Sequence, residues 1–90
     1  MSERKRIAIV GTGLIGGSLA IQLHEKKLSS RLIGVDTNED HARKALELEL
    51  VDEILPLEEA IRGSDVIVLA VPVDVMVALL PVILDKVDKQ

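Results

Sequence analysis

The 90-residue sequence contains no cysteine and no phenylalanine, tyrosine or tryptophan. The absence of cysteine excludes disulfides, thiol catalysis and thiolate metal sites, and it fits a reducing, cytoplasmic setting. The absence of aromatic residues means that the core must be aliphatic and that a bound base can stack only on aliphatic groups. Hydrophobic residues still make up 48% of the chain, so the sequence is sufficient for one small domain at most.

Positive charge is also scarce, since the formal net charge is −4 and basic clusters are as short as Arg4–Arg6 and Lys26–Lys27. A surface of this kind does not favour nucleic acid as a partner. No apolar run is long enough to span a membrane. The basic residues before the first apolar stretch resemble a secretory signal, but glycines and the polar residues Thr12 and Ser18 interrupt that stretch.

The strongest pattern lies near the N-terminus, where a glycine-rich turn separates a predicted strand from a predicted helix. The apolar run Ile7–Val10 predicts a buried strand, and apolar residues recur at helical spacing up to Leu23. Between them, Gly11, Gly13 and Gly16 are spaced G-x-G-x-x-G. In this strand–turn–helix context the spacing predicts a dinucleotide-binding turn, whereas the alternative is a loop of an unrelated α/β domain.

Each glycine of the motif has a separate expected role. Gly11 allows the tight turn, Gly13 lets the backbone approach a pyrophosphate, and Gly16 lets the helix pack against the strand. The N-terminus of that helix would then direct its free N–H groups and its positive dipole end toward the phosphates.

Asp36 supplies the second part of the signal. It follows the apolar run Arg31–Val35 and lies twenty residues beyond Gly16. A carboxylate at this position accepts hydrogen bonds from an adenosine ribose and repels a 2′-phosphate. Because Thr37 and Asn38 offer no cation, the pattern favours NAD over NADP; the alternative for Asp36 is an ordinary turn or capping residue.

The remaining strands are expected at 32–35, 51–55 and 66–71, each separated by a helix. Val66–Val71 is continuously apolar and mostly β-branched, which is typical of a strand buried on both faces. The alternation predicts an α/β, Rossmann-like doubly wound parallel sheet of about four strands in the order 3-2-1-4. The cofactor would lie between the first and fourth strands, beside Val71, Pro72 and Val73, although this loop is equally well explained as a plain strand end.

Helices are expected at 14–26, after Asn38, at 57–62 and from Asp74 onward. Asn38 and Asp74 are predicted N-caps, Gly63 is predicted to close the third helix, and Pro81 to kink or break the fourth. The second helix should bury an apolar face formed by Ala42, Ala45 and Leu46.

The two histidines, His24 and His41, are expected to be solvated helix residues away from the cofactor. The sequence has no cysteine and no cluster of histidines with carboxylates, so neither a metal site nor a catalytic residue is predicted.

Four stretches together resemble the N-terminal domain of prephenate dehydrogenases: IAIVGTGLIGGSLA, GVD after the second strand, VDEI, and SDVIVLAVPV. The resemblance covers nearly the whole chain, and GLIGGSLA is its most specific part. It implies NAD-dependent oxidative decarboxylation of prephenate to 4-hydroxyphenylpyruvate in tyrosine biosynthesis, with arogenate as a substrate of close relatives. It also implies cofactor contacts, which fall on Gly11, Gly13, Leu14, Ile15, Gly16, Asp36, Val71, Pro72 and Val73.

The sequence departs from that family at two places. Relatives have a glycine near Glu49, and a left-handed glutamate would cost about 1 kcal/mol, so we expect a different helix end here. The chain also stops before a fifth strand, and the family's catalytic histidine and substrate-binding arginine lie further along and in a helical C-terminal domain. Residues 1–90 should therefore form one partial dinucleotide-binding domain that is inactive alone, with prephenate bound only by the full-length parent. The alternative is a stand-alone nucleotide-sensing module without catalysis.

The missing fifth strand also affects assembly. The strand at 66–71 would present an unpaired apolar edge, which is a template for pairing with another chain. Because a core of this size is marginal by itself, we predict a homodimer around the fourth strand and the segment Asp74–Val87.

Overall fold

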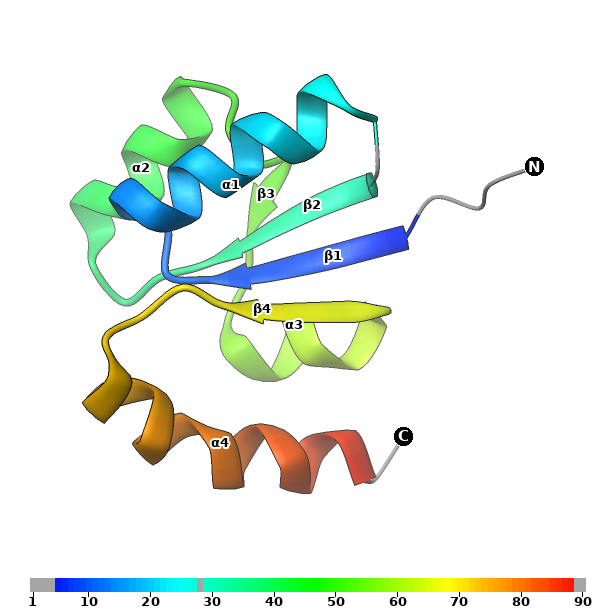
Figure 1. The fold of residues 1–90 in the computed structure, drawn as a ribbon, viewed down its shortest axis with the longest axis vertical. Helices are drawn as coiled ribbons and strands as arrows, with labels where there is room; N and C mark the ends of the chain where they lie inside the picture. The colour runs from blue at the N-terminus through cyan, green and yellow to red at the C-terminus, as the bar shows by residue number, and fades with distance from the viewer. Residues whose placement is uncertain (1–4, 28, 89–90) are drawn as a thin grey trace.

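The computed structural model describes residues 5–27 and 29–88. Its centre is a parallel sheet of four strands: β1 (Lys5–Val10), β2 (Ser29–Val35), β3 (Glu53–Ile54) and β4 (Val66–Leu69). The strand order is β3-β2-β1-β4, which confirms the predicted doubly wound arrangement (Figure 1).

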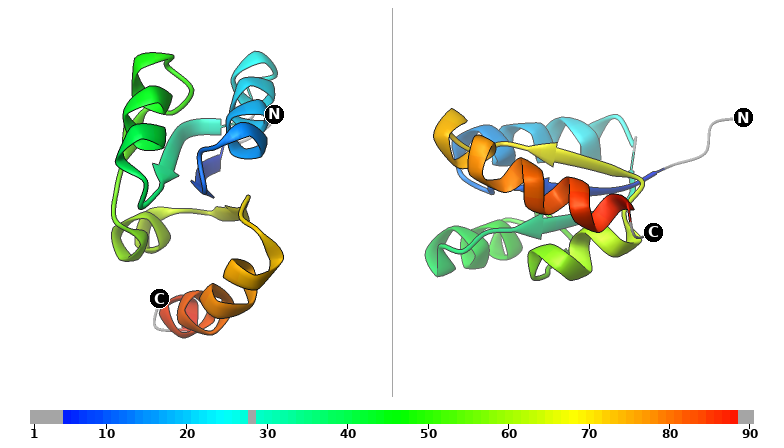
Figure 2. Two further views of the ribbon diagram at one scale, coloured as in Figure 1. Left: turned by 90° about the vertical axis from the view of Figure 1, so that its left-hand side faces the viewer. Right: turned by 90° about the horizontal axis from the view of Figure 1, so that it is seen from below.

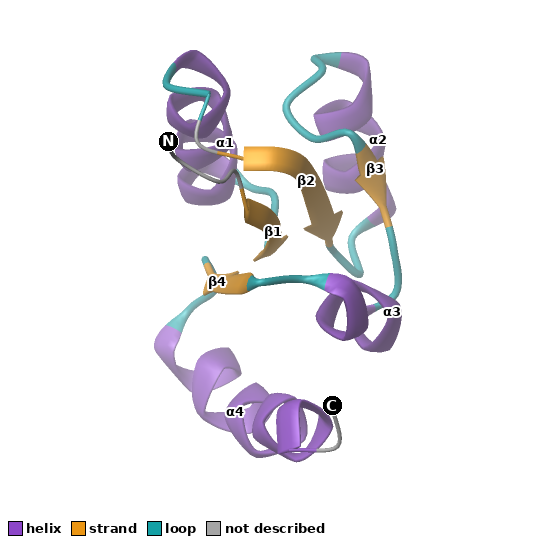
Figure 3. Ribbon diagram, turned by 90° about the vertical axis from the view of Figure 1, so that its right-hand side faces the viewer, coloured by secondary structure: helices purple, strands orange, loops and turns teal. Residues whose placement is uncertain are grey.

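Two pairs of helices cover the two faces of the sheet. α1 (Leu14–Glu25) and α2 (Glu39–Glu47) lie on one face, and α3 (Leu57–Gly63) and α4 (Val73–Asp88) lie on the other (Figure 2). Figure 3 shows α4 beside α3 and further from the sheet than the other helices.

The core has two layers because successive side chains of a strand point to opposite faces of the sheet. Ile7 and Ile9 of β1 join the layer under α1 and α2, together with Leu32 of β2. Ala8 and Val10, which alternate with them, join the layer on the α3 side. Removing these aliphatic surfaces from water is the main stabilisation of the domain.

The register of the strands brings three loops to one edge of the sheet. Val10 pairs with Val35 on one side and with Leu69 on the other. The amide of Gly11 donates to the Val35 carbonyl at 2.7 Å, so the chain leaves β1 directly beside the end of β2. The glycine turn, Asp36 and the loop after β4 therefore meet at the carboxyl ends of the strands.

Two aspartates tie neighbouring strands together. The Asp52 carboxylate accepts from the Leu32 amide at 2.6 Å, while the Asp52 amide donates to the Leu32 carbonyl at 2.8 Å. Asp65 makes the equivalent pair with Arg6, at 3.0 and 2.8 Å. Both aspartates belong to stretches that resemble prephenate dehydrogenases, and their contacts here are structural.

The end of α2 contradicts the expectation for Glu49, which does adopt a left-handed conformation with φ 57°. The Leu50 amide donates to the Ala45 carbonyl at 2.8 Å and the Glu49 amide to the Leu46 carbonyl at 3.1 Å, the pattern of a Schellman motif. These bonds satisfy carbonyls at the helix end, and Leu50 packs against the core, which together offset the backbone strain.

α3 ends at Gly63, as predicted, but it does so without a left-handed residue. Gly63 is the last residue of the helix, and Ser64 after it is extended, with φ −98° and ψ 142°. A Cβ at residue 63 would collide with the guanidinium of Arg6, so this glycine provides space for a side chain from β1.

In α4, the prediction that Asp74 is the N-cap is corrected, and Pro81 does not break the helix. The helix begins at Val73, so Asp74 lies in its first turn instead of capping it. Pro81 lies inside the helix, which continues to Asp88. Proline removes the hydrogen bond to the carbonyl four residues earlier. That residue, Val77, is 64% exposed, so water can reach the carbonyl instead.

Several lengths and burial patterns differ from expectation. β2 begins earlier, at Ser29, whereas β3 has only two residues and β4 ends at Leu69. Leu46 is 44% exposed, so the buried face of α2 is centred on Ala45 instead. β4 is not buried on both faces, since Val66 is 40% exposed. The reason is that β4 is an edge strand with one neighbour, and α4 covers it only partly.

Candidate functional site

The glycine turn between β1 and α1 is close-packed at two of its three positions. Gly11 has φ 96°, and a Cβ there would lie 2.5 Å from the Ala70 carbonyl oxygen and 2.9 Å from a methyl group of Val71. A Cβ at Gly16 would collide with the carbonyl of Gly11. Both glycines are required by the packing of the turn against β4 and α1, as the motif predicts.

Gly13 differs, because the protein itself does not require a glycine there. The nearest atoms to an added Cβ belong to the His41 ring at 3.9 Å, which is ordinary contact distance. Gly13 is also the N-cap of α1, with no side-chain cap and no acidic residue in the first turn. The first N–H groups of α1 are thus available to an anion, and Gly13 leaves room for it to approach.

Asp36 is held at the end of β2 by the glycine turn. One carboxylate oxygen, Oδ2, accepts from the Thr12 amide at 2.8 Å and from the Thr12 hydroxyl at 2.9 Å. The other, Oδ1, accepts from the Asn38 amide at 2.9 Å. Because a carboxylate has about four acceptor positions, these bonds leave room for one more donor.

The protonation of Asp36 follows from these contacts. Partial burial raises its pKa, but the hydrogen bonds from the Thr12 amide, the Asn38 amide and the Thr12 hydroxyl act in the opposite direction, as does the nearby His41. Together they lower the pKa of Asp36 below its ordinary value. Asp36 is therefore an anion near neutral pH.

His41 is a half-exposed residue of α2, as expected, but it lies beside this site and not away from it, which corrects the second part of the expectation. Asn38 caps α2 as predicted, and its side chain accepts from the amides of Asp40 and His41. This cap turns the first turn of α2 back over the end of β2, which leaves the Nδ1 atom of His41 3.5 Å from Oδ2 of Asp36. The Asn38 cap was the sequence signal that could have predicted this. Because it starts α2 soon after Asp36, the first turn of the helix brings His41 back to the end of the strand.

His24 lies away from this site. Its Nε2 atom is 3.0 Å from the Leu50 carbonyl, a contact between α1 and the loop after α2. Within the described part of the chain, His24 therefore serves as a structural contact.

Two cavities flank the glycine turn. The α4-side cavity has a volume of about 190 Å³ and combines Asp36 with aliphatic side chains from both faces of the turn. Its lining residues are Val10, Gly11, Val35, Asp36, Thr37, Leu57, Val71, Val75 and Leu79.

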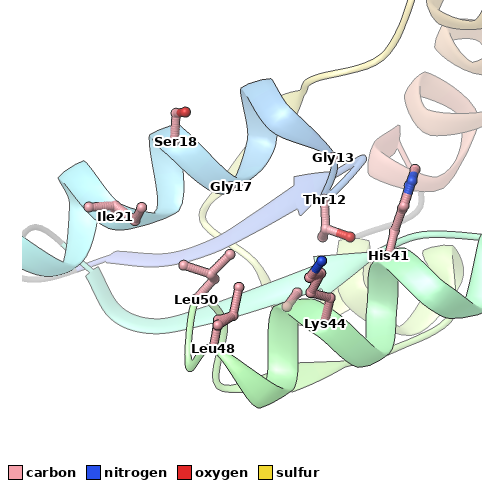
Figure 4. Close-up of a pocket in the computed structure, with 10 residues that line it drawn as sticks. Thr12, Gly13, Gly17, Ser18, Ile21, His41, Lys44, Leu48 and Leu50 are labelled. Atoms are coloured by element: carbon pink, nitrogen blue, oxygen red, sulfur yellow. The ribbon is translucent and has the colours of Figure 1, made fainter.

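The α1–α2 cavity is larger, about 410 Å³, and lies on the other side of the turn (Figure 4). Its aliphatic lining includes Ile21, Leu48 and Leu50. Its polar end is formed by Thr12, Gly13, His41 and Lys44, and in Figure 4 the side chains of Thr12 and Lys44 point toward one another.

The structure gathers most, but not all, of the predicted site residues. Gly11, Gly13, Asp36 and Val71 line one cavity or the other, and Gly16 supports the turn from within. The backbone of Leu14 and Ile15 forms the start of α1, while their side chains are outside the described set. Pro72 and Val73 line neither of these two cavities: the Pro72 carbonyl accepts from the Met76 amide at 2.9 Å, and Val73 is 73% exposed.

Residues 6–90 match the family model described as "NADP oxidoreductase coenzyme F420-dependent". The chain belongs to this family. Among curated relatives it is similar to prephenate dehydrogenase of Bacillus subtilis (strain 168), with 30% identity over 69 residues, or 76% of this chain and 19% of the relative. It is also similar to malate dehydrogenase of Neorickettsia sennetsu, with 38% identity over 77 residues, 71% of this chain and 24% of the relative.

A solved structure is similar to this chain in fold as well as in sequence. Prephenate dehydrogenase from A. aeolicus, in complex with hydroxyphenyl propionate and NAD+, matches with a TM-score of 0.74 and 27% identity. The match covers 96% of this chain and 29% of that chain. The resemblance to the dinucleotide-binding part of prephenate dehydrogenases is thereby confirmed, and the chain spans less than a third of these proteins.

No helix within residues 5–27 and 29–88 combines the length and the apolar character that crossing a bilayer requires.

Proposed function

We propose that this chain is the NAD-binding domain of an oxidoreductase similar to prephenate dehydrogenase. The observation that carries the proposal is the pairing of an ionised Asp36 with an uncapped α1 N-terminus at which Gly13 leaves space. The Asp36 carboxylate suits a ribose, and the N-terminus of α1 suits a pyrophosphate. Thr12 connects them, because it donates to Asp36 and directly precedes Gly13.

The residues fit a dinucleotide in three parts. The N–H groups at the start of α1 would hold the pyrophosphate, and the remaining acceptor position of Asp36 would take a ribose hydroxyl. The adenine would contact the aliphatic wall of the α4-side cavity, which includes Val71 and Leu79. When bound, NAD supplies the hydride acceptor, and this chain orients it.

The choice of NAD over NADP rests on Asp36, although the family description names NADP. The hydrogen bonds that lower the pKa of Asp36 keep it negative, and a 2′-phosphate beside it would meet like charge. The NAD+ present in the A. aeolicus complex supports the same choice.

The proposed reaction of the whole protein is oxidative decarboxylation of prephenate in tyrosine biosynthesis, in the cytoplasm. We assign no catalytic residue to this chain, because His41 lies on the ribose side of the site and His24 contacts the Leu50 carbonyl. The catalytic groups would then come from outside residues 1–90. The names of the relatives, all dehydrogenases, support this function over a non-catalytic sensing module.

Calorimetric titration with NAD and NADP tests the cofactor assignment. The chain should bind NAD more tightly than NADP, and Asp36→Arg should reverse the order because a phosphate partner replaces a ribose acceptor. Glu59→Arg, on the exposed first turn of α3, is the control with the same charge change. Asp36→Asn serves if the arginine variant melts early, and unchanged relative affinities in folded variants would remove Asp36 from the site.

We also propose that the chain forms a homodimer through β4 and α4. β4 is an edge of the described sheet, and α4 exposes Val73, Val77, Leu80 and Leu84 at spacings of four, three and four residues. This spacing places them along one stripe of the helix, which suits a second helix as partner.

Sedimentation equilibrium at micromolar concentration tests the dimer. Val77→Lys with Leu84→Lys should shift the chain to monomer, because both side chains are more than half exposed in the single chain. The control is Leu48→Lys, equally exposed but at the end of α2. A wild-type monomer with a cooperative melt would contradict the proposal.

A further inference from the structure

We propose that His41 makes the choice between NAD and NADP depend on pH, by acting as a titratable counter-charge to Asp36. This inference rests on the proposed function, since it assumes that Asp36 holds the adenosine ribose. Neutral His41 leaves Asp36 to repel a 2′-phosphate, whereas protonated His41 offers that phosphate a cation.

The geometry places the imidazole where a 2′-substituent would come. Nδ1 of His41 is 3.5 Å from Oδ2 of Asp36, and the ring is 3.9 Å from the position of a Cβ on Gly13. A ribose that donates a hydroxyl to Asp36 therefore has His41 as its neighbour. The polar end of the α1–α2 cavity, which His41 lines, provides the space for a phosphate on that ribose.

A second cation stands at the same end of the cavity. Lys44 lies on α2 close to one turn after His41 and lines the cavity together with Thr12 (Figure 4). Lysine, unlike histidine, is a residue type that does not serve as a switch near neutral pH. Lys44 would thus supply a constant attraction for a phosphate, and His41 the part that varies.

The charged groups near His41 include two carboxylates. At the end of β2, His41 faces Asp36, and the lowered pKa of Asp36 keeps this carboxylate ionised. On α2 the neighbouring Asp40 is paired with Arg43 at 2.8 Å. The glycine turn presents only Thr12 and Gly13, which carry no charge. Histidine is the residue type that changes charge between pH 5 and 8.

The experiment measures the dissociation constants of NAD and NADP by calorimetry at about pH 6 and about pH 8, at constant ionic strength. We expect the preference for NAD to fall about tenfold at the lower pH, as for the addition of one charge close to the phosphate. A phosphate monoester itself titrates near pH 6, so the variant His41→Asn is needed to measure that contribution separately.

In His41→Asn, the change in the preference for NAD between the two pH values should shrink to the part that comes from titration of the phosphate itself. In His41→Lys, where the charge is permanent, the preference for NAD should be weak at both pH values. Lys44→Met should weaken NADP binding at both pH values and leave the pH dependence in place.

The outcomes separate the two proposals. A preference for NAD over NADP that changes with pH to the same extent in wild type and in His41→Asn would overturn the role of His41 and leave the proposed function standing. Absence of binding of either dinucleotide by the folded chain would overturn the proposed function, and the role of His41 with it.

Discussion

The inner strands and the segment from β4 to α4 are equally apolar in sequence but differ sharply in burial. Ile9 of β1 and Ile33 of β2 are fully buried, whereas Val66 of β4 is 40% exposed and Val77 of α4 is 64% exposed. Between Val66 and Val87, all within the described ranges, Ile83 is the one buried residue. Apolar composition thus predicts strands and helices here, but burial depends on having neighbours on both sides.

This difference bears on the candidate site. Gly11, Thr12 and Asp36 belong to the well-packed part, where the amides of Gly11 and Thr12 donate to the end of β2 and so fix the glycine turn. The side of the α4-side cavity formed by Val75 and Leu79 belongs to the weakly packed helix. We expect the pyrophosphate and ribose contacts to be preformed and the adenine wall to be the more adaptable part.

The largest expected effect tests the contrast directly by truncating one residue in each region. Ile9→Ala should lower the free energy of unfolding by about 3 kcal/mol, because it leaves a cavity in a core that cannot collapse freely. Val77→Ala should change it by less than about 0.5 kcal/mol, because its side chain is already in water. Urea unfolding at protein concentrations that keep the chain monomeric is the measurement, and equal losses in the two variants would show that α4 is better packed than described.

A smaller effect is expected at the end of α2, within the well-packed part. Glu49→Gly should stabilise the chain by about 1 kcal/mol, because glycine adopts the left-handed conformation without the Cβ contact. The control is Glu47→Gly at the last residue of the same helix, which is not in the left-handed region and should gain no stability. A loss of stability in Glu49→Gly would mean that the glutamate side chain makes a favourable contact that outweighs the strain.

The smallest expected effect is the pH dependence of stability that comes from Asp36. Its pKa is lower in the folded chain than its ordinary value of 3.8, so the stabilisation is fully present above that value and is lost as pH falls through the folded pKa. Thermal melts of the wild type and of Asp36→Asn should therefore differ most near neutral pH and converge in strong acid. Thr12→Val, which removes the hydroxyl donor to Asp36, should remove part of this difference in thermal stability. Melting curves that stay apart in acid would show that the ionised form of Asp36 is not what stabilises the fold.

Much of the fold could be predicted because its signals are local. The alternation of apolar runs and helical periods indicates the strands and helices, and the glycine spacing with Asp36 predicts the strand order β3-β2-β1-β4. The Asn38 cap is equally local, since its side chain binds amides two and three residues away. The residues of the site that lie on β1, β2 and the turn between them follow from the same short-range rules.

Other features depend on which segments meet in space, and the sequence pattern does not contain that information. The guanidinium of Arg6, 57 residues earlier, occupies the space beside Gly63, and no local turn rule indicates this contact. Glu49 adopts a left-handed conformation because the hydrogen bonds of the α2 end and the packing of Leu50 outweigh a local strain of about 1 kcal/mol.

The same distinction decides the chemistry of the site. The sequence by itself determined that a carboxylate follows β2 and that glycines precede α1, because both are read along one strand–turn–helix unit. Only the tertiary structure decided that His41 stands 3.5 Å from that carboxylate and that Lys44 shares a cavity with Thr12. The physical reason is that an electrostatic contact depends on distance in space, which the packing of α2 against β2 and the glycine turn sets.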